Sequence, residues 1–243
     1  MMLSTVFSAA MRLTSSTFDI DGIVGKAEID SENKTVDVTV EPMDISSVEP
    51  DVKVSEGAMV TTETLVDGQA VTFDVTAENG TIVSWEVTAK VQHGISFTYK
   101  SDSKVVLTAG VIDSTDPDTN ELVGDGVPYG YRYESGYYSY IYAMKKENEY
   151  NESWKHYARL YFIGSDTVDL NEFSAQLYYY RDGALYLTNY YYYLPFNLSI
   201  TKYGKVGGSI QGIFSGTVRT YDGTYKFHEL SDGFFKVRRL ENY

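Results

Sequence analysis

Hydrophobic and polar residues alternate with a period of two along most of the chain. Segment 34–41 carries a valine at every second position, with polar residues between them: Val36, Val38 and Val40. Segments 71–77 and 85–91 repeat this pattern on either side of Glu78-Asn79-Gly80, residues that tolerate a positive φ. Because successive side chains of a strand point to opposite faces, these segments predict half-buried strands and a β-hairpin. We therefore expect an all-β protein.

The first ninety residues hold further short runs of this kind, near 18–20, 52–54 and 59–65. Six or seven short strands at this spacing are typical of a β-sandwich, and the tryptophan at 85 is expected in its core. Segment 145–153 is polar apart from Tyr150 and is expected to form a loop or one short helical turn.

The C-terminal part repeats the alternation with larger side chains. We expect two strands joined at Asp182-Gly183, then three strands turning at Asp222-Gly223 and Asp232-Gly233. Gly212 and Gly216 fall on the apolar face of one of them, which predicts either a close approach of a neighbouring element or a bulge. The expected architecture is a second antiparallel β-sandwich or a barrel-like domain.

Composition divides the chain near His93-Gly94. All 23 tyrosines follow this point, the first being Tyr99, whereas residues 1–93 hold 5 basic and 16 acidic side chains. Two domains with different surfaces explain this asymmetry. We expect a leader or signal remnant at 1–15, an Ig-like β-sandwich at 16–93 and a tyrosine-rich antiparallel β-domain at 95–243.

Net charge and cysteine content narrow the function classes. The 243 residues carry a formal net charge of −14 and no cysteine. An acidic chain repels phosphate backbones and anionic lipids, so we expect no nucleic-acid partner. Without cysteine there are no disulfides, no thiol catalysis and no cysteine zinc sites.

Two stretches resemble domains of known bacterial protein families. "VSEGA" at 54–58 and "FDVTAENG" at 73–80 resemble an Ig-like domain of unknown function, found in Bacteroides-type surface lipoproteins, over residues 16–92. Asn79 stands where that family more often has Asp. "ITKYGKVGGSIQGIFSGTV" and "DGFFKVRRL" are similar to a C-terminal β-domain of secreted Bacteroidota proteins of unassigned activity, with Ile213 where Thr is commoner.

The resemblance implies export and display in the bacterial cell envelope, on the outer surface or as a secreted protein. It also implies lipid anchoring through an N-terminal cysteine, which is missing from this chain. Membrane attachment is therefore expected only through such an anchor. Neither family supplies a catalytic motif.

Catalytic signatures are sparse. His93, His156 and His228 lie far apart and form no H-E-x-x-H motif, and Ser215 belongs to an alternating strand instead of a strand-to-helix elbow. We expect no catalytic residues and no enzyme activity. A glycan hydrolase would need two carboxylates flanking the scissile bond, and 34 acidic residues give no basis for choosing a pair.

One acidic loop partly matches a calcium-binding pattern. Asp116, Asp118 and Asn120 occupy positions one, three and five, but Glu121 replaces the glycine at position six and Val127 the glutamate at position twelve. A calcium site here and a solvated loop of turn-forming residues are both compatible with this sequence. Otherwise we expect no cofactor.

The tyrosine runs are the strongest remaining signal. Alternation places half of each run on an outer face, where aromatic rings can stack on sugars or anchor a protein. The alternative is burial in the core with cross-strand aromatic pairs. Our candidate ligand-binding residues are Trp154, Tyr138, Tyr140, Tyr179 and Tyr192.

These observations favour a non-catalytic module of the cell surface, in which an Ig-like spacer presents a tyrosine-rich β-domain that binds a polysaccharide or a surface protein. The alternative is a structural or adhesive subunit, such as a pilus-associated one, whose exposed strand edges pair with another chain. A glycan hydrolase is a third hypothesis.

Overall fold

A computed structural model gives the fold of this protein. It describes residues 18–99, 103–108, 114–115, 122–123, 129–132, 138–144, 156–164, 169–170, 175–181, 184–188, 194–221 and 224–240. The backbone contacts divide the chain into two compact units. The first holds Met1–Val40 and Ile45–Val91, and the second holds Glu41–Asp44 and Gln92–Tyr243.

The regular secondary structure of the described residues is almost entirely β-strand, which confirms the all-β class. The regular helical structure among them is a single turn of 3-10 helix, Ile45–Ser47. No helix in the described part of the chain is long and apolar enough to cross a membrane.

The first unit is built on a five-stranded sheet in the order β2-β3-β7-β6-β5. Its strands are β2 (Glu28–Asp30), β3 (Thr35–Val40), β5 (Met59–Thr61), β6 (Ala70–Thr76) and β7 (Ile82–Val91). β3 pairs with β7 in parallel, while the other neighbours are antiparallel. The valines of β3 are all buried, as the alternation predicted.

The predicted hairpin is confirmed. β6 and β7 pair from Ala70–Thr88 to Thr76–Ile82, and Gly80 between them has a φ of 82°. The expected core position of Trp85 is also confirmed, since 1% of its surface is exposed.

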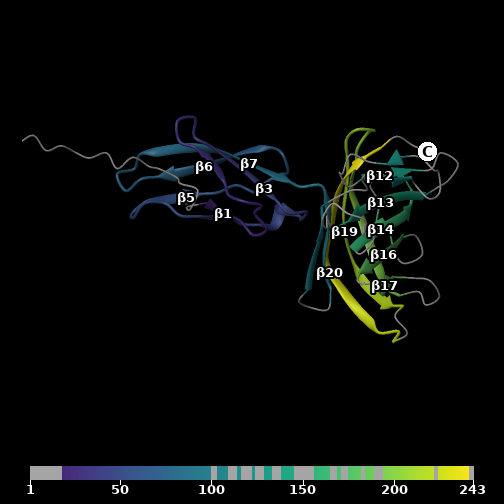
Figure 1. The fold of residues 1–243 in the computed structure, drawn as a ribbon. Helices are drawn as coiled ribbons and strands as arrows, with labels where there is room; N and C mark the ends of the chain where they lie inside the picture. The colour runs from purple at the N-terminus through teal and green to yellow at the C-terminus, as the bar shows by residue number, and fades with distance from the viewer. Residues whose placement is uncertain are drawn as a thin grey trace, which may run out of the picture. The chain divides into compact units, whose positions relative to one another are not determined.

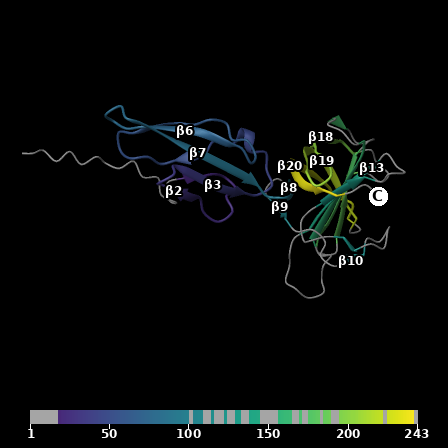
Figure 2. The ribbon, with the colours of Figure 1, turned by 90° about the horizontal axis from the view of Figure 1, so that it is seen from above.

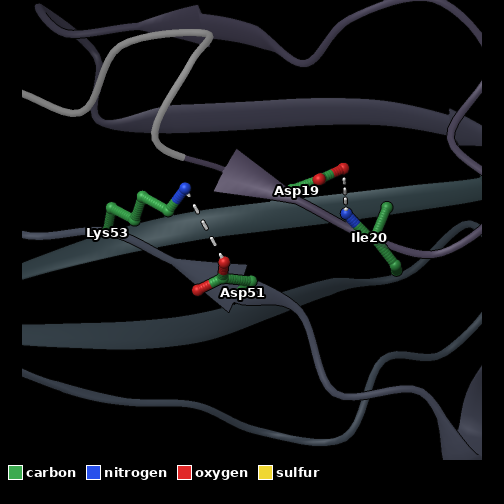
Figure 3. Close-up of polar contacts among 4 residues, drawn as sticks. All are labelled: Asp19, Ile20, Asp51 and Lys53. Atoms are coloured by element: carbon green, nitrogen blue, oxygen red, sulfur yellow. Dashed lines mark hydrogen bonds and ion pairs between the residues drawn. The ribbon is translucent and has the colours of Figure 1, made fainter.

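A two-stranded ribbon of β1 (Phe18–Asp19) and β4 (Asp51–Val52) completes the first unit. The ring of Phe18 lies 6.3 Å from that of Phe73 in β6, so the ribbon covers a face of the five-stranded sheet. Figure 3 shows its polar contacts: the Ile20 backbone N–H donates to the Asp19 side chain at 2.9 Å, and Lys53 lies 4.0 Å from Asp51.

The second unit contains two facing layers of strands. One layer follows the order β15-β18-β19-β20-β8-β9. Its strands are β8 (Gly94–Tyr99), β9 (Ser103–Leu107), β15 (Asp169–Leu170), β18 (Phe196–Tyr203), β19 (Ser209–Thr220) and β20 (Phe227–Arg239). A separate two-stranded pair is formed by β10 (Ser114–Thr115) and β11 (Leu122–Val123).

The other layer follows the order β12-β13-β14-β16-β17, visible as neighbouring ribbons in Figure 1 and as the opposite layer in Figure 2. Its strands are β12 (Tyr129–Arg132), β13 (Tyr138–Met144), β14 (His156–Ile163), β16 (Ala175–Arg181) and β17 (Ala184–Leu187). We call this layer the tyrosine sheet.

Two long strands join the layers into a barrel-like closure. β19 pairs with β18 along Ile210–Gly216 and then with β17 at Arg219 and Thr220. β20 pairs with β8 and then with β12 near Arg239. Both edges of the tyrosine sheet are therefore hydrogen-bonded to these strands. Between the layers lies one apolar core, which includes Phe97, Leu160, Phe162, Phe196 and Phe235.

The close approach expected at Gly212 is confirmed. A Cβ at this position would lie 2.4 Å from the Ser199 carbonyl oxygen and 2.7 Å from the Phe235 ring. Gly216 lies at a register shift and has a φ of 155°.

The prediction of a turn at Asp232-Gly233 is wrong. These residues lie inside β20, where the register shifts against both β8 and β19. Asp232 has a φ of 53°, a conformation that serves a bulge as well as a hairpin turn. The expected three strands are therefore two long ones. The loop expected at 145–153 and the leader at 1–15 lie outside the described residues.

Candidate functional site

Among the described residues, the outer face of the tyrosine sheet gathers a group of aromatic side chains that lie outside the core. In its central strands every second residue is buried against the core: Ile141, Ala143, Ala158, Leu160, Phe162, Ala175, Leu177 and Tyr179. The residues between them are partly exposed, and they are mostly tyrosines. Alternation alone produces this arrangement, because the tyrosines occupy the opposite parity of the same strands.

Three of these tyrosines form a ladder across neighbouring strands. The ring of Tyr161 in β14 lies 5.8 Å from that of Tyr140 in β13 and 5.8 Å from that of Tyr178 in β16. Both pairs have an interplanar angle of 31°. Cross-strand aromatic pairs of this kind stabilise a sheet and hold their rings in defined positions. We call these residues the tyrosine ladder.

A second aromatic pair and an arginine flank the ladder. Tyr157 and Tyr180 stack with ring centroids 5.5 Å apart at 21°. The Arg159 guanidinium lies 4.6 Å from the ring centroid of Tyr178 and is hydrogen-bonded to the Tyr142 hydroxyl. A guanidinium over an aromatic face is held by the negative potential of the ring.

The partial burial of this face shifts its titrating groups. Burial raises the pKa of the Tyr161 phenol well above its ordinary value, and the neighbouring Tyr178 reinforces the shift. Burial also raises the pKa of Tyr157. For Arg159 burial acts against the charged form, but the neighbouring Tyr142, Tyr178 and Tyr157 together outweigh it and the pKa is raised. At neutral pH Tyr157 and Tyr161 are therefore protonated and Arg159 is a cation.

Tyr140 is the candidate residue that the structure brings into the tyrosine ladder. Tyr138 pairs with Ile163 in the same strand register, and its side chain is not among those described. Trp154 and Tyr192 lie outside the described residues. Whether any of them binds a ligand stays a prediction.

The choice of Tyr179 as a ligand-binding candidate is corrected by the structure, which buries this residue. Only 1% of its surface is exposed, and its ring lies 5.0 Å from Phe97 and 5.5 Å from Tyr186. It belongs to the core because its position in β16 has the parity of Leu177. The sequence established that neighbours in the run 178–180 face opposite ways, but did not say which of them faces inward.

Sequence reasoning did not select Arg159, Tyr161 or Tyr178 as site residues. A signal was present in "HYARLYF", where Tyr157, Arg159 and Tyr161 recur at every second position. Their importance depends on which strands become neighbours, and this pairing is a property of the fold.

The weak calcium candidates, Asp116, Asp118 and Asn120, lie outside the described residues. Within the described ranges, no group of three His, Asp or Glu side chains could hold a metal ion. Of the histidines, His228 packs its ring 5.0 Å from that of Tyr99.

Comparisons with known proteins bear mainly on the first unit. Residues 15–89 match the model of a family described as SGBP, N-terminal. No curated protein matches the chain. One similar solved structure is a "putative glycoside hydrolase" from Bacteroides thetaiotaomicron, 15% identical, with a TM-score of 0.27. That match covers 53% of this chain and 44% of the other, and its TM-score is too low to carry an argument.

Proposed function

We propose that this protein is a non-catalytic module of the bacterial cell surface, which binds a polysaccharide through the outer face of the tyrosine sheet. The SGBP family, whose N-terminal domain matches residues 15–89, comprises surface glycan-binding proteins of the Bacteroidota type. This match supports the cell-surface location and the class of ligand. The lipid anchor and the Ig-like character of the first unit belong to the same proposal.

The tyrosine ladder is the main observation that supports this face as the binding surface. Its rungs repeat at 5.8 Å, on three successive strands, and each ring stays partly exposed. Tyrosine combines an apolar ring with a polar hydroxyl, so it can contact both the C–H surface and the hydroxyls of a sugar. A polysaccharide lying across the strands would meet one tyrosine per strand.

The described strand edges give less support to a structural or adhesive subunit. The free edges of the two main sheets are β15, of two residues, β9, of five, and β2 and β5, of three each. Pairing with another chain is favoured by long, flat edges. The tyrosine sheet itself has both edges paired.

A glycan hydrolase is also less well supported on this face. Retaining and inverting glycosidases both use two carboxyl groups beside the scissile bond. The alternate positions that define the outer face of β12, β13, β14, β16 and β17 contain no Asp or Glu. The carboxylates on which that chemistry depends are therefore missing from the tyrosine sheet.

Binding of the full chain to an array of soluble polysaccharides tests this function. We expect saturable binding that Tyr140→Ala and Tyr161→Ala each weaken by about threefold to tenfold, since an aromatic contact contributes about 0.5–1.5 kcal/mol. The matched control is Ile213→Ala, which removes an exposed apolar side chain from β19 instead of the tyrosine sheet.

Thermal unfolding of each variant separates binding from folding. Tyr140→Ala is expected to keep the melting temperature within a few degrees of the wild type, because its ring is partly exposed. Binding that survives both substitutions, or that is lost equally in Ile213→Ala, would refute the tyrosine sheet as the binding face. No binding across the array would argue against glycan recognition.

A further inference from the structure

The hairpin that joins β19 to β20 ends in a turn held by Thr220. The Thr220 backbone N–H donates to the Lys226 carbonyl at 2.9 Å, and the Lys226 N–H donates to the Thr220 hydroxyl oxygen at 2.9 Å. The Tyr221 N–H donates to the Leu185 carbonyl of β17 at 2.7 Å. These bonds fix the backbone on both sides of the turn, so the described side chains at this end of the hairpin stand on a defined base.

Three aromatic side chains gather around Arg219 at this end of the hairpin. The Arg219 guanidinium lies 4.3 Å from the Tyr225 ring centroid and 5.2 Å from that of Tyr221, and the two rings are 6.0 Å apart at an interplanar angle of 84°. Cation–π and edge-to-face contacts of this kind hold rings in place. Phe227 is the register partner of Arg219 and therefore shares its face of the sheet. We call Tyr221, Tyr225 and Phe227 the aromatic tip.

The aromatic tip is more exposed than the tyrosine ladder. Tyr225 is 51% exposed and Phe227 58%, and they are the two aromatic side chains among the exposed large hydrophobic residues that the structure describes. Single exposed apolar residues are common, but two aromatic rings beside the same arginine form a small apolar patch. Burial in the core therefore does not explain these two residues.

Tyr225 holds its ring here in a strained backbone conformation. Its φ of 51° lies in the left-handed region, where a bulky side chain is rarely found. Glycine or asparagine would adopt this conformation with less strain. Strained residues cluster at binding sites, where the surrounding structure holds them in place. The turn itself therefore gives no reason for a tyrosine at this position, whereas contact with a ligand does.

We propose that the aromatic tip is a second sugar-binding site, in which a pyranose ring of the polysaccharide packs against Tyr225 and Phe227. This inference rests on the proposed function for the class of its ligand. A pyranose presents C–H groups on the faces of its ring, and these pack on an aromatic surface. The hydroxyls of Tyr221 and Tyr225 supply hydrogen-bonding groups for the polar rim of the sugar.

The aromatic tip is separate from the tyrosine ladder. β17 lies between β16, which holds Tyr178, and β19, which holds Arg219. Leu187 of β17 is only 5% exposed, so the two sites do not form one surface. A polysaccharide that crosses the strands can contact both sites, and two contacts on one polymer raise its affinity above that of either site alone.

Titration of the full chain with soluble polysaccharides tests the second site. The probes are mixed-linkage β-glucan, xylan, galactomannan and amylopectin. For a polymer that the wild type binds, Phe227→Ala and Tyr225→Asn are each expected to weaken the affinity by about threefold to tenfold, since each removes one aromatic contact. The matched control is Ile82→Ala, which removes a side chain of similar exposure, 60%, from the first unit.

Two substitutions of Tyr225 separate the role of the ring from the stability of the turn. Asparagine tolerates a positive φ better than alanine, so Tyr225→Asn is expected to unfold at a higher temperature than Tyr225→Ala. Both variants lack the ring and are expected to bind equally weakly. Wild-type affinity in Tyr225→Asn together with weak binding in Tyr225→Ala would assign the residue to the turn alone and overturn the proposal.

Failure of this inference is distinguishable from failure of the proposed function. Full affinity in both Phe227→Ala and Tyr225→Asn, beside weakened binding in Tyr161→Ala, would overturn the second site and leave the proposed function intact. An equal loss in Ile82→Ala would overturn it as well, because the effect would not be specific to the aromatic tip. The absence of binding to every polysaccharide would overturn both proposals.

Discussion

Single positions in the tyrosine sheet acquire opposite roles from their parity. Tyr178 and Tyr179 are adjacent and chemically identical, but Tyr179 fills the core and Tyr178 belongs to the outer ladder. The alternation of the sequence predicts that the two side chains diverge. Which of the two faces inward depends on the pairing with β14, where Tyr179 lies opposite the buried Ala158 and Tyr178 opposite Arg159, and the sequence does not identify these residues as neighbours.

Alkaline pH provides a prediction at the scale of one residue. The folded protein holds the proton of the Tyr161 phenol more tightly than the unfolded chain, in which tyrosine titrates near pH ~10. The stability contributed by this raised pKa is fully present below pH ~10 and is lost as the pH rises above it. Tyr161→Phe, which has no such proton, is expected to show a shallower alkaline loss of stability.

Urea unfolding midpoints measured from about pH 8 to about pH 11 check this expectation. The tyrosine signal in the near-ultraviolet circular dichroism follows the second unit, since the first tyrosine is Tyr99. Identical slopes against pH for the wild type and Tyr161→Phe would contradict it.

At the scale of the element, the regular strands were well predicted from the sequence, whereas the bulged strand β20 was not. The hairpin of β6 and β7 and the crowded Gly212 follow from local sequence. The bulge in β20 was mistaken for a turn because Asp-Gly permits a positive φ in both settings. Only the partners of the strand distinguish the two, and β8 and β19 run past the bulge on either side.

Gly212 gives a prediction at the scale of the element. A side chain here would collide with the Ser199 carbonyl and the Phe235 ring, so the two long strands would have to separate locally. Gly212→Val is expected to destabilise the second unit by about 1–3 kcal/mol or more, as overpacking does in close-packed cores. Ser215→Ala, at an exposed position of β19, is the control and is expected to change stability little.

Chemical denaturation followed by tyrosine circular dichroism measures both variants. A wild-type midpoint for Gly212→Val would mean that β18 and β20 can give way without cost. An equal loss in both variants would place the sensitivity in β19 as a whole.

At the scale of the whole molecule, local sequence predicts the boundary between the two units but not the closure of the second unit. The change of composition near residue 93 falls where the chain passes into the second unit. In contrast, the closure of the second unit was not predictable, because Tyr129 pairs with Arg238 across a hundred residues of sequence. No local pattern encodes such a contact, and many strand orders would satisfy the same alternation.

Charge asymmetry gives a prediction for the two units. The first unit, Met1–Val40 and Ile45–Val91, holds 14 acidic and 5 basic side chains, so repulsion within it opposes its folding at low salt. Raising sodium chloride from about 0.02 M to about 0.5 M should raise the unfolding midpoint of the first unit more than that of the second.

Buried Trp85 reports the first unit if Trp154→Phe removes the other of the two tryptophans, and tyrosine circular dichroism reports the second. A larger salt effect on the tyrosine signal than on Trp85 fluorescence would contradict the charge argument.

The closed edges of the tyrosine sheet have a consequence for how a polymer would occupy it. Because β12 and β17 are hydrogen-bonded to the long strands, the strand register of the sheet is fixed. The rings of the tyrosine ladder therefore keep a constant spacing of 5.8 Å. A repeating chain can then settle in many equivalent registers, displaced by one sugar at a time. Long polymers gain from this multiplicity without any new contact, so chain length would count in recognition alongside the identity of the sugar.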